Sequence, residues 1–130
     1  MTNQELIAKA KEEMTKAYAP YSHFQVGAAL LAKDGRVFTG CNVENATYGA
    51  TICAERTAVT KAVSEGVREF EKIAIVASSG DYTAPCGICR QVLFEFMPEG
   101  KVVLWSELEG EKEFALTELL PFGFRGEDIK

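Results

Sequence analysis

Two pairs of residues have the types and the spacing needed for metal-assisted hydrolysis. Cys53 and Glu55 form a Cys-x-Glu motif, and Cys86 and Cys89 form a Cys-x-x-Cys motif directly after Pro85. Three thiolates fill three of the four tetrahedral positions of a zinc ion, and an open fourth position is typical of catalytic rather than structural sites. Because Glu55 is not needed as a ligand, its carboxylate is available for general acid–base chemistry beside an activated water. The pattern therefore predicts a hydrolytic zinc site.

Each cysteine motif is expected to lie at the start of a helix. One helix runs from Cys53 to about Glu65, where Gly66 is placed to end it, and another opens at Cys86 and runs to about Met97. Residues three apart share one face of a helix, so both thiols of the Cys-x-x-Cys motif can reach one metal ion. The free N–H groups and the positive dipole end of a helix N-terminus favour thiolate over thiol.

A Cys-x-x-Cys pair also occurs in redox proteins and in structural zinc sites. The redox interpretation is weakened because the expected thioredoxin-like context is missing. A structural site needs a fourth protein ligand, and the remaining cysteine and histidine, Cys41 and His23, lie outside any ligand-like spacing. We expect Cys41 to be a small buried residue and His23 an exposed loop residue. Adding the Cys-x-Glu motif to the pair therefore favours metal catalysis.

Arg56 lies three residues after Cys53, on the same side of the predicted helix. Three thiolates around Zn²⁺ leave a net charge of about −1, which weakens the ability of the metal to acidify water. A guanidinium beside the sulfurs can donate hydrogen bonds to them and withdraw charge. We predict this supporting role for Arg56, and the alternative is an ordinary surface arginine.

The rest of the chain supplies a sheet and further helices that position these groups. A capping-box pattern at residues 2–5 starts a helix that is expected to run to about Tyr18, before Pro20. Apolar runs predict strands at 24–32, 37–43, 72–77 and 102–105, a short edge strand at 114–116 and a helical turn at 117–120.

The pattern of these elements indicates the fold class. The Asp-Gly pair within residues 33–36 is typical of a hairpin turn. Strands that are apolar at every position suit a sheet that is covered on both faces. We therefore predict an α/β fold, a three-layer α/β/α sandwich around a mixed sheet of about five strands. Residues 1–130 are expected to form a single catalytic domain.

Composition narrows the possible partners. The chain carries a net charge of −5, and no run of lysines and arginines offsets it. That sign repels phosphate backbones, so we expect no nucleic acid as the main partner. The first residues contain no apolar signal-peptide region, and no stretch is apolar for long enough to span a membrane. We therefore expect a cytoplasmic protein whose reduced cysteines are available for a metal.

Three segments of the chain, residues 41–46, 53–58 and 85–91, resemble the small homotetrameric cytidine deaminases. The likeness extends from the N-terminal helix to residues 119–121, almost the whole chain. It implies hydrolytic deamination of free cytidine and 2′-deoxycytidine in pyrimidine salvage, by a cytidine deaminase-like fold assembled as a homotetramer. It also implies one Zn²⁺ per subunit held by Cys53 and the Cys-x-x-Cys pair, with Glu55 as the proton shuttle.

The resemblance also implies substrate-binding positions, which are Phe24, Asn42, Val43, Glu44, the backbone of Ala54, and Phe124. Asn42 and Glu44 match residues that hydrogen-bond the ribose hydroxyls, although both could be turn formers after a strand. Phe24 matches an aromatic that packs on the pyrimidine ring, although it could be a core residue. Ala54 matches a contact to the base edge.

The C-terminal segment resembles the family less closely. Phe124 matches an aromatic side chain that is contributed to a neighbouring active site, and Phe122 competes for that role. Tyr48 either lines the pocket or packs beneath it, and the sequence leaves both interpretations open.

Other functions share part of this pattern. One is an aminohydrolase for a different aminopyrimidine such as blasticidin S, in which we would not expect the Asn-Val-Glu-Asn segment at 42–45. A polynucleotide-editing deaminase should show a basic groove. A zinc-stabilised binding module should coordinate the ion fully with protein ligands and should release no ammonia.

Overall fold

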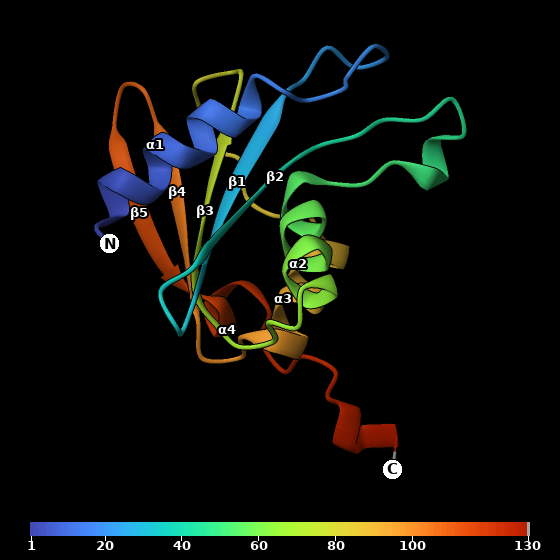
Figure 1. Ribbon diagram of the computed structural model, residues 1–130, viewed down its shortest axis with the longest axis vertical. Helices are drawn as coiled ribbons and strands as arrows, with labels where there is room; N and C mark the ends of the chain where they lie inside the picture. The colour runs from blue at the N-terminus through green and yellow to red at the C-terminus, as the bar shows by residue number, and fades with distance from the viewer. Residues whose placement is uncertain (130) are drawn as a thin grey trace.

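The computed structural model describes residues 1–129 and contains a five-stranded mixed sheet. In chain order its strands are β1 (Val26–Ala32), β2 (Val37–Cys41), β3 (Phe70–Ala77), β4 (Lys101–Ser106) and β5 (Gly110–Ala115). Their order across the sheet is β2-β1-β3-β4-β5 (Figure 1). β3 and β4 run parallel, whereas the other neighbouring pairs are antiparallel. The predicted mixed sheet is confirmed.

Helices cover both faces of this sheet (Figure 1). α1 (Asn3–Met14) packs on one face, and α2 (Ala54–Ser64) and α3 (Gly87–Phe96) lie on the other. The shorter helical segments are α4 (Leu116–Leu119) and the 3₁₀ turns η1 (Tyr48–Ala50) and η2 (Gly126–Ile129). No helix within residues 1–129 has both the length and the apolar character that crossing a membrane requires. The three-layer α/β/α arrangement is as predicted.

The core lies on both sides of β1, which is buried along its whole length. Ala28 and Leu30 belong to the apolar cluster under α2 and α3, whereas Ala29 and Leu31 belong to the cluster under α1. Successive side chains of a strand point to opposite faces, so a central strand covered on both sides must be apolar at every position. This is why its unbroken apolar sequence predicts the strand.

Two predicted boundaries are wrong at the end of the sheet that faces the cysteine motifs. α1 ends at Met14 rather than near Tyr18, because the Tyr18 N–H donates to the carbonyl of Asn42 at 3.0 Å and its carbonyl accepts from the Glu44 N–H at 2.8 Å. A backbone group that is engaged in this pairing cannot also form the hydrogen bonds of the helix. The second wrong boundary is the start of β1, which begins at Val26 rather than at residue 24, so the residues before it form a loop.

The last strand is longer than predicted and the turns agree with the sequence. β5 covers Gly110–Ala115 rather than 114–116, because its first residues are polar and exposed at the edge of the sheet and carry no apolar signal. β2 ends at Cys41 rather than at 43. Gly35 in the hairpin and Gly66 after α2 adopt φ values of 95° and 88°, which glycine reaches without strain.

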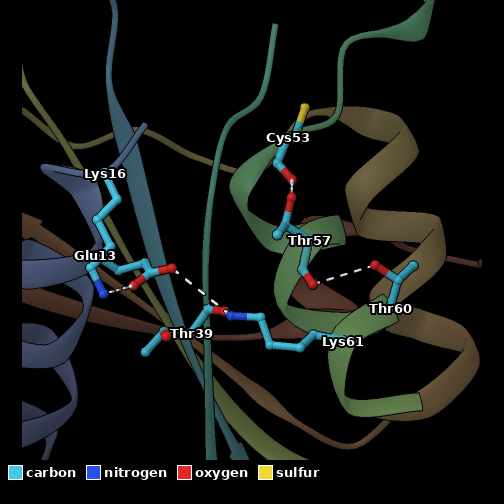
Figure 2. Close-up of polar contacts among 7 residues, drawn as sticks. All are labelled: Glu13, Lys16, Thr39, Cys53, Thr57, Thr60 and Lys61. Carbon is cyan, nitrogen blue, oxygen red and sulfur yellow. Dashed lines mark hydrogen bonds and ion pairs between the residues drawn. The ribbon is translucent and has the colours of Figure 1, made fainter. Parts of the chain in front are cut away.

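Charged side chains from both helical layers meet around the β2 edge (Figure 2). Glu13 of α1 is buried and forms ion pairs with Lys16 at 3.2 Å and with Lys61 of α2 at 3.9 Å. Lys61 Nζ also donates to the carbonyl of Thr39 on β2. An exposed edge strand can pair with another chain, and lysine side chains oppose this. The Glu13–Lys61 pair therefore joins α1 to α2 and protects the edge.

Two glycines let the helices approach the sheet closely. A Cβ at Gly27 would lie 2.0 Å from the carbonyl oxygen of Ala10, and a Cβ at Gly40 would lie 2.4 Å from that of Ala54. We expect Gly27→Ala and Gly40→Ala each to lower the free energy of unfolding by about 1–3 kcal/mol in urea titrations, the usual cost of overpacking. Gly49→Ala is the control, because its Cβ would meet nothing within 4 Å. An equal loss in that control would contradict the explanation.

Candidate active site

The three predicted ligand sulfurs meet at the N-termini of α2 and α3. Cys53 and Cys86 are the N-cap residues of these helices, and Cys89 lies in the first turn of α3. Their Sγ atoms all lie within 4.8 Å of one another, and those of Cys53 and Cys86 are 3.9 Å apart. Two sulfurs bound to one tetrahedral Zn²⁺ at about 2.3 Å lie about 3.8 Å apart. The cluster therefore has the donor atoms and the spacing to hold zinc.

The protein favours a thiolate in this cluster. Hydrogen bonds from the Cys89 thiol and the Arg56 guanidinium lower the pKa of Cys53 to about 5. The same contact with Cys53, together with burial, raises the pKa of Cys89. A metal ion needs deprotonated sulfur ligands, so its binding would release the proton that this pair retains. The donor set thus fits a soft divalent cation.

Arg56 lies beside the sulfurs, as the sequence predicts. Its Nη2 donates to the Sγ of Cys53 at 3.3 Å, and this contact raises the pKa of the guanidinium. Its Nε is buried and has no hydrogen-bond partner among residues 1–129. A buried donor without a partner is unusual in folded proteins. It fits a site whose thiolate sulfurs, when they bind a metal, also accept hydrogen bonds from the guanidinium.

Glu55 lies in the first turn of α2 and is only 5% exposed. Burial raises the pKa of its carboxyl to about 7, and the charge of the neighbouring Cys53 thiolate acts in the same direction. A carboxyl group with a pKa near neutrality can both accept and donate a proton. Glu55 therefore has the environment of a general acid and base.

Asn42 is buried and its side chain secures the residues that lead into β1. Its Oδ1 accepts from the Val26 N–H at 2.9 Å, and its Nδ2 donates to the carbonyl of Phe24 at 2.8 Å. One N–H of the amide is left for another acceptor. Phe24 is held in the loop before β1 and is 38% exposed, so its interpretation as a core residue is wrong.

Glu44 anchors the loop between α1 and β1. Its carboxylate accepts hydrogen bonds from the Ser22 hydroxyl, from the Ser22 N–H at 3.1 Å and from the Tyr21 N–H at 3.0 Å. These bonds, with the Ser22 hydroxyl contributing most, lower the pKa of Glu44. A carboxylate can accept about four hydrogen bonds, so room remains for one further donor. No motif or periodicity in the sequence connects Ser22 to Glu44, so their contact could not be predicted.

Val43 connects these polar residues to the cysteine cluster through its backbone. Its N–H and carbonyl pair with the carbonyl and N–H of Ile52 at 2.9 and 3.0 Å, and Ile52 directly precedes Cys53. No hydrogen bond described within residues 1–129 joins Asn42 or Glu44 to a cysteine. The fold nevertheless brings residues 42–44 beside the start of α2, where the fully buried Ala54 lies.

The aromatic candidates are exposed on two projecting segments (Figure 1). Tyr48, in η1, is 75% exposed, and its ring packs edge-on against that of Tyr21 with centroids 6.0 Å apart. Phe122 and Phe124 are both exposed in the C-terminal segment, which turns away from the sheet. Gln91 fixes the backbone of Phe124 with a 2.7 Å bond to its carbonyl and a 3.3 Å bond from its N–H.

His23 and Cys41 lie outside the sulfur cluster. His23 is exposed as expected and has a left-handed backbone with φ 59°, whereas Cys41 is half-buried rather than buried. A groove of about 680 Å³ lies near the start of β3, with Phe70 and Met97 in its lining. None of the predicted site residues lines it, because α2 and α3 begin at the other end of the sheet.

Comparisons with known proteins agree with the fold and the cysteine cluster. The family description of the cytidine and deoxycytidylate deaminase zinc-binding region matches residues 1–105. The cytidine deaminase of Sporosarcina psychrophila is 48% identical over 130 residues, which cover 99% of this chain and 96% of that protein. The cytidine deaminase of Halalkalibacterium halodurans is 51% identical over 130 residues, with 99% and 98% covered.

A solved structure agrees equally well. The crystal structure of cytidine deaminase from Burkholderia pseudomallei matches with a TM-score of 0.90 and 49% identity, covering 95% of this chain and 100% of that chain. The family match extends over most of the chain, and the relatives align over nearly all of it. This chain therefore belongs to the cytidine and deoxycytidylate deaminase family, which is defined by a zinc-binding region.

Proposed function

We propose that this enzyme uses zinc to hydrolyse free cytidine and 2′-deoxycytidine to uridine and 2′-deoxyuridine, with release of ammonia, as a step of pyrimidine salvage. The observation that carries the proposal is the group of three cysteine sulfurs within 4.8 Å of one another, beside the buried Glu55 carboxyl with its pKa near 7. Cytidine deaminase is also the name of relatives that are 48% and 51% identical.

The proposed mechanism assigns one role to each residue of the cluster. Cys53, Cys86 and Cys89 hold one Zn²⁺ per chain, which would supply a water activated for attack on C4 of the cytosine ring. Glu55 accepts a proton from that water and delivers it to ring nitrogen N3. Glu55 then takes the remaining proton of the hydroxyl added at C4 and passes it to the amine, so that the C4–N bond breaks, the carbonyl forms, and water and cytidine yield uridine and ammonia. Arg56 donates to the Cys53 sulfur and withdraws charge from it.

Nucleoside recognition is assigned to the segments that flank β1 and β2. The free N–H of Asn42 and the remaining acceptor site of Glu44 would meet ribose hydroxyls. The partly exposed Phe24 would pack on the pyrimidine, and the backbone of Ala54 would contact the base edge. Val43 contributes through the backbone pairing that holds this segment beside α2. These assignments are supported by position and by unused hydrogen-bonding capacity.

We also propose that the chain is a single catalytic domain that works in the cytoplasm as a homotetramer. Phe124 supports the assembly, because its backbone is fixed by Gln91 while the residue is 57% exposed. An exposed ring on a fixed backbone is suited to entering the active site of a neighbouring subunit, and Phe122 is the competing candidate. Sedimentation of active enzyme should show a tetramer, and an active monomer would contradict the assembly.

The decisive experiment follows ultraviolet absorbance while cytidine is added, with and without a zinc chelator. We expect conversion to uridine that stops with the chelator and returns with Zn²⁺. The substrate panel includes 2′-deoxycytidine, blasticidin S and a single-stranded oligonucleotide. The net charge of −5 favours the free nucleosides over the oligonucleotide. If blasticidin S or the oligonucleotide is turned over faster than cytidine, the proposed substrate is wrong. If no ammonia is released from any of them, the protein is better explained as a binding module.

The role of Glu44 gives a testable change in substrate affinity. We expect Glu44→Gln to lower kcat/KM for cytidine by about 10–100-fold, because a hydrogen bond to a charged group is lost. The variant also weakens the anchoring of Ser22, so 3′-deoxycytidine separates the two effects. A ribose contact predicts that wild type discriminates between cytidine and 3′-deoxycytidine and that the variant discriminates far less. Equal discrimination in both would limit Glu44 to the loop, and Glu12→Gln on the exposed side of α1 is the control.

A further inference from the structure

Arg90 joins the loop before α3 to the C-terminal part of the chain. Its Nε donates to the carbonyl of Pro85 at 2.7 Å, and its Nη1 donates to the carbonyl of Leu119, the last residue of α4, also at 2.7 Å. Pro85 is buried and directly precedes Cys86. Arg90 thus contacts the backbone beside a proposed metal ligand without being part of the proposed chemistry.

The segment that Arg90 holds has few other backbone hydrogen bonds. Within residues 1–129, the Pro85 carbonyl is the only backbone group from Tyr82 to Pro85 that has a hydrogen-bond partner in the protein. Proline has no N–H of its own, and a buried carbonyl without a donor is costly. The Arg90 contact therefore fixes the direction in which the chain enters Cys86, the N-cap of α3.

An arginine side chain is well suited to holding the carbonyls of Pro85 and Leu119 together. The guanidinium is a rigid planar fork that can hold two acceptors in fixed directions, whereas a lysine amine offers a single charged point. None of the ion pairs described within residues 1–129 includes Arg90, so its described partners are the two carbonyls. Its role is thus one of geometry rather than of charge pairing.

We infer that Arg90 is a positioning residue for the metal centre, which acts through Pro85 to keep Cys86 in place and links this loop to α4. The inference rests on the proposed function in taking Cys86 as a zinc ligand. Without Arg90, Cys86 samples orientations that do not bind the metal, so zinc leaves faster and kcat falls. KM changes little, because Arg90 has no described hydrogen bond to Phe24, to residues 42–44 or to Ala54.

The test compares Arg90→Met, Arg90→Lys and Gln91→Met in the zinc-loaded protein. Gln91 is the matched control, because it holds the C-terminal segment at Phe124 but does not contact Pro85. Zinc release is followed with a chromophoric chelator, together with kcat, KM and thermal unfolding. We expect Arg90→Met to release zinc about 10–100-fold faster, the usual range for a contact that orients a ligand. Arg90→Lys should be intermediate, and Gln91→Met should release zinc at the wild-type rate.

Each other outcome contradicts part of the inference. A wild-type release rate in Arg90→Met, or equally fast release in Gln91→Met, would overturn it while the proposed function stands. If Arg90→Met does not fold, Arg90→Lys carries the same comparison, and wild-type release and kcat in that variant would overturn the requirement for the planar fork. A wild-type chain that binds no zinc would overturn the proposed function and this inference together.

Discussion

Glu55→Gln is expected to lower kcat for cytidine by about 10²–10⁴-fold, the range that general acid–base catalysis contributes. The physical reason is that an amide of nearly the same shape can neither accept the proton of the attacking water nor deliver it to N3. Burial holds the Glu55 carboxyl at a pKa of about 7, so the wild-type group exchanges protons readily at neutral pH. The amide loses this capacity and leaves the three sulfurs in place.

The controls for this variant separate chemistry from folding. Zinc content and the thermal unfolding midpoint should stay close to wild type, because Glu55 is not one of the clustered ligands. Glu65→Gln provides a matched substitution at the C-terminal end of the same helix, where the side chain is exposed, and it should leave kcat unchanged. Near-normal turnover in a zinc-loaded Glu55→Gln protein would show that another group moves the proton.

Cys86→Ala is expected to lose zinc and to reduce turnover by about 100-fold or more. Removing one of three thiolates leaves only two protein donors, which is fewer than catalytic zinc sites use. Cys86 is exposed, so its truncation costs little packing, and the loss can be assigned to the metal. The measurement is metal content per chain after dialysis, combined with the cytidine assay before and after addition of Zn²⁺.

The fourth cysteine gives the control for this experiment. Cys41 lies outside the sulfur cluster, so Cys41→Ala should keep one zinc per chain and wild-type turnover. Wild-type protein stripped by a chelator should recover with Zn²⁺, whereas Cys86→Ala should not. One tightly held zinc in Cys86→Ala, or loss of zinc from Cys41→Ala, would show that the ligand set has been assigned wrongly.

The two cysteine motifs could be predicted because the geometry within each of them is local. Cys86 and Cys89 share one helical turn, and Glu55 follows Cys53 at the start of a second helix. Helix geometry is the same in every protein, so these spacings place the groups before any tertiary contact is known. Central strands can also be predicted from the sequence, since a strand that is buried on both faces must be apolar throughout.

The loops around the site could not be predicted in the same way. The Glu44 carboxylate binds Ser22, and Arg90 binds the carbonyl of Leu119, across 22 and 29 residues of sequence. Loop backbones have no repeating geometry, so the direction of a hydrogen-bonding group depends on which segments pack together. The end of α1 also depends on such a contact. The local sequence predicts a helix to about Tyr18, but the backbone of Tyr18 bonds instead to the segment after β2.

The sequence therefore specified the family, the cysteine motifs and the layered fold, because residue types, short spacings and burial patterns are properties of neighbouring positions. The structure added the meeting of two helix N-termini, the burial that brings the pKa of Glu55 to about 7, and the Val43–Ile52 pairing that carries residues 42–44 to Cys53. These features arise between distant segments of the chain. Packing around the shared sheet brings those segments together, and no local sequence pattern predicts this packing.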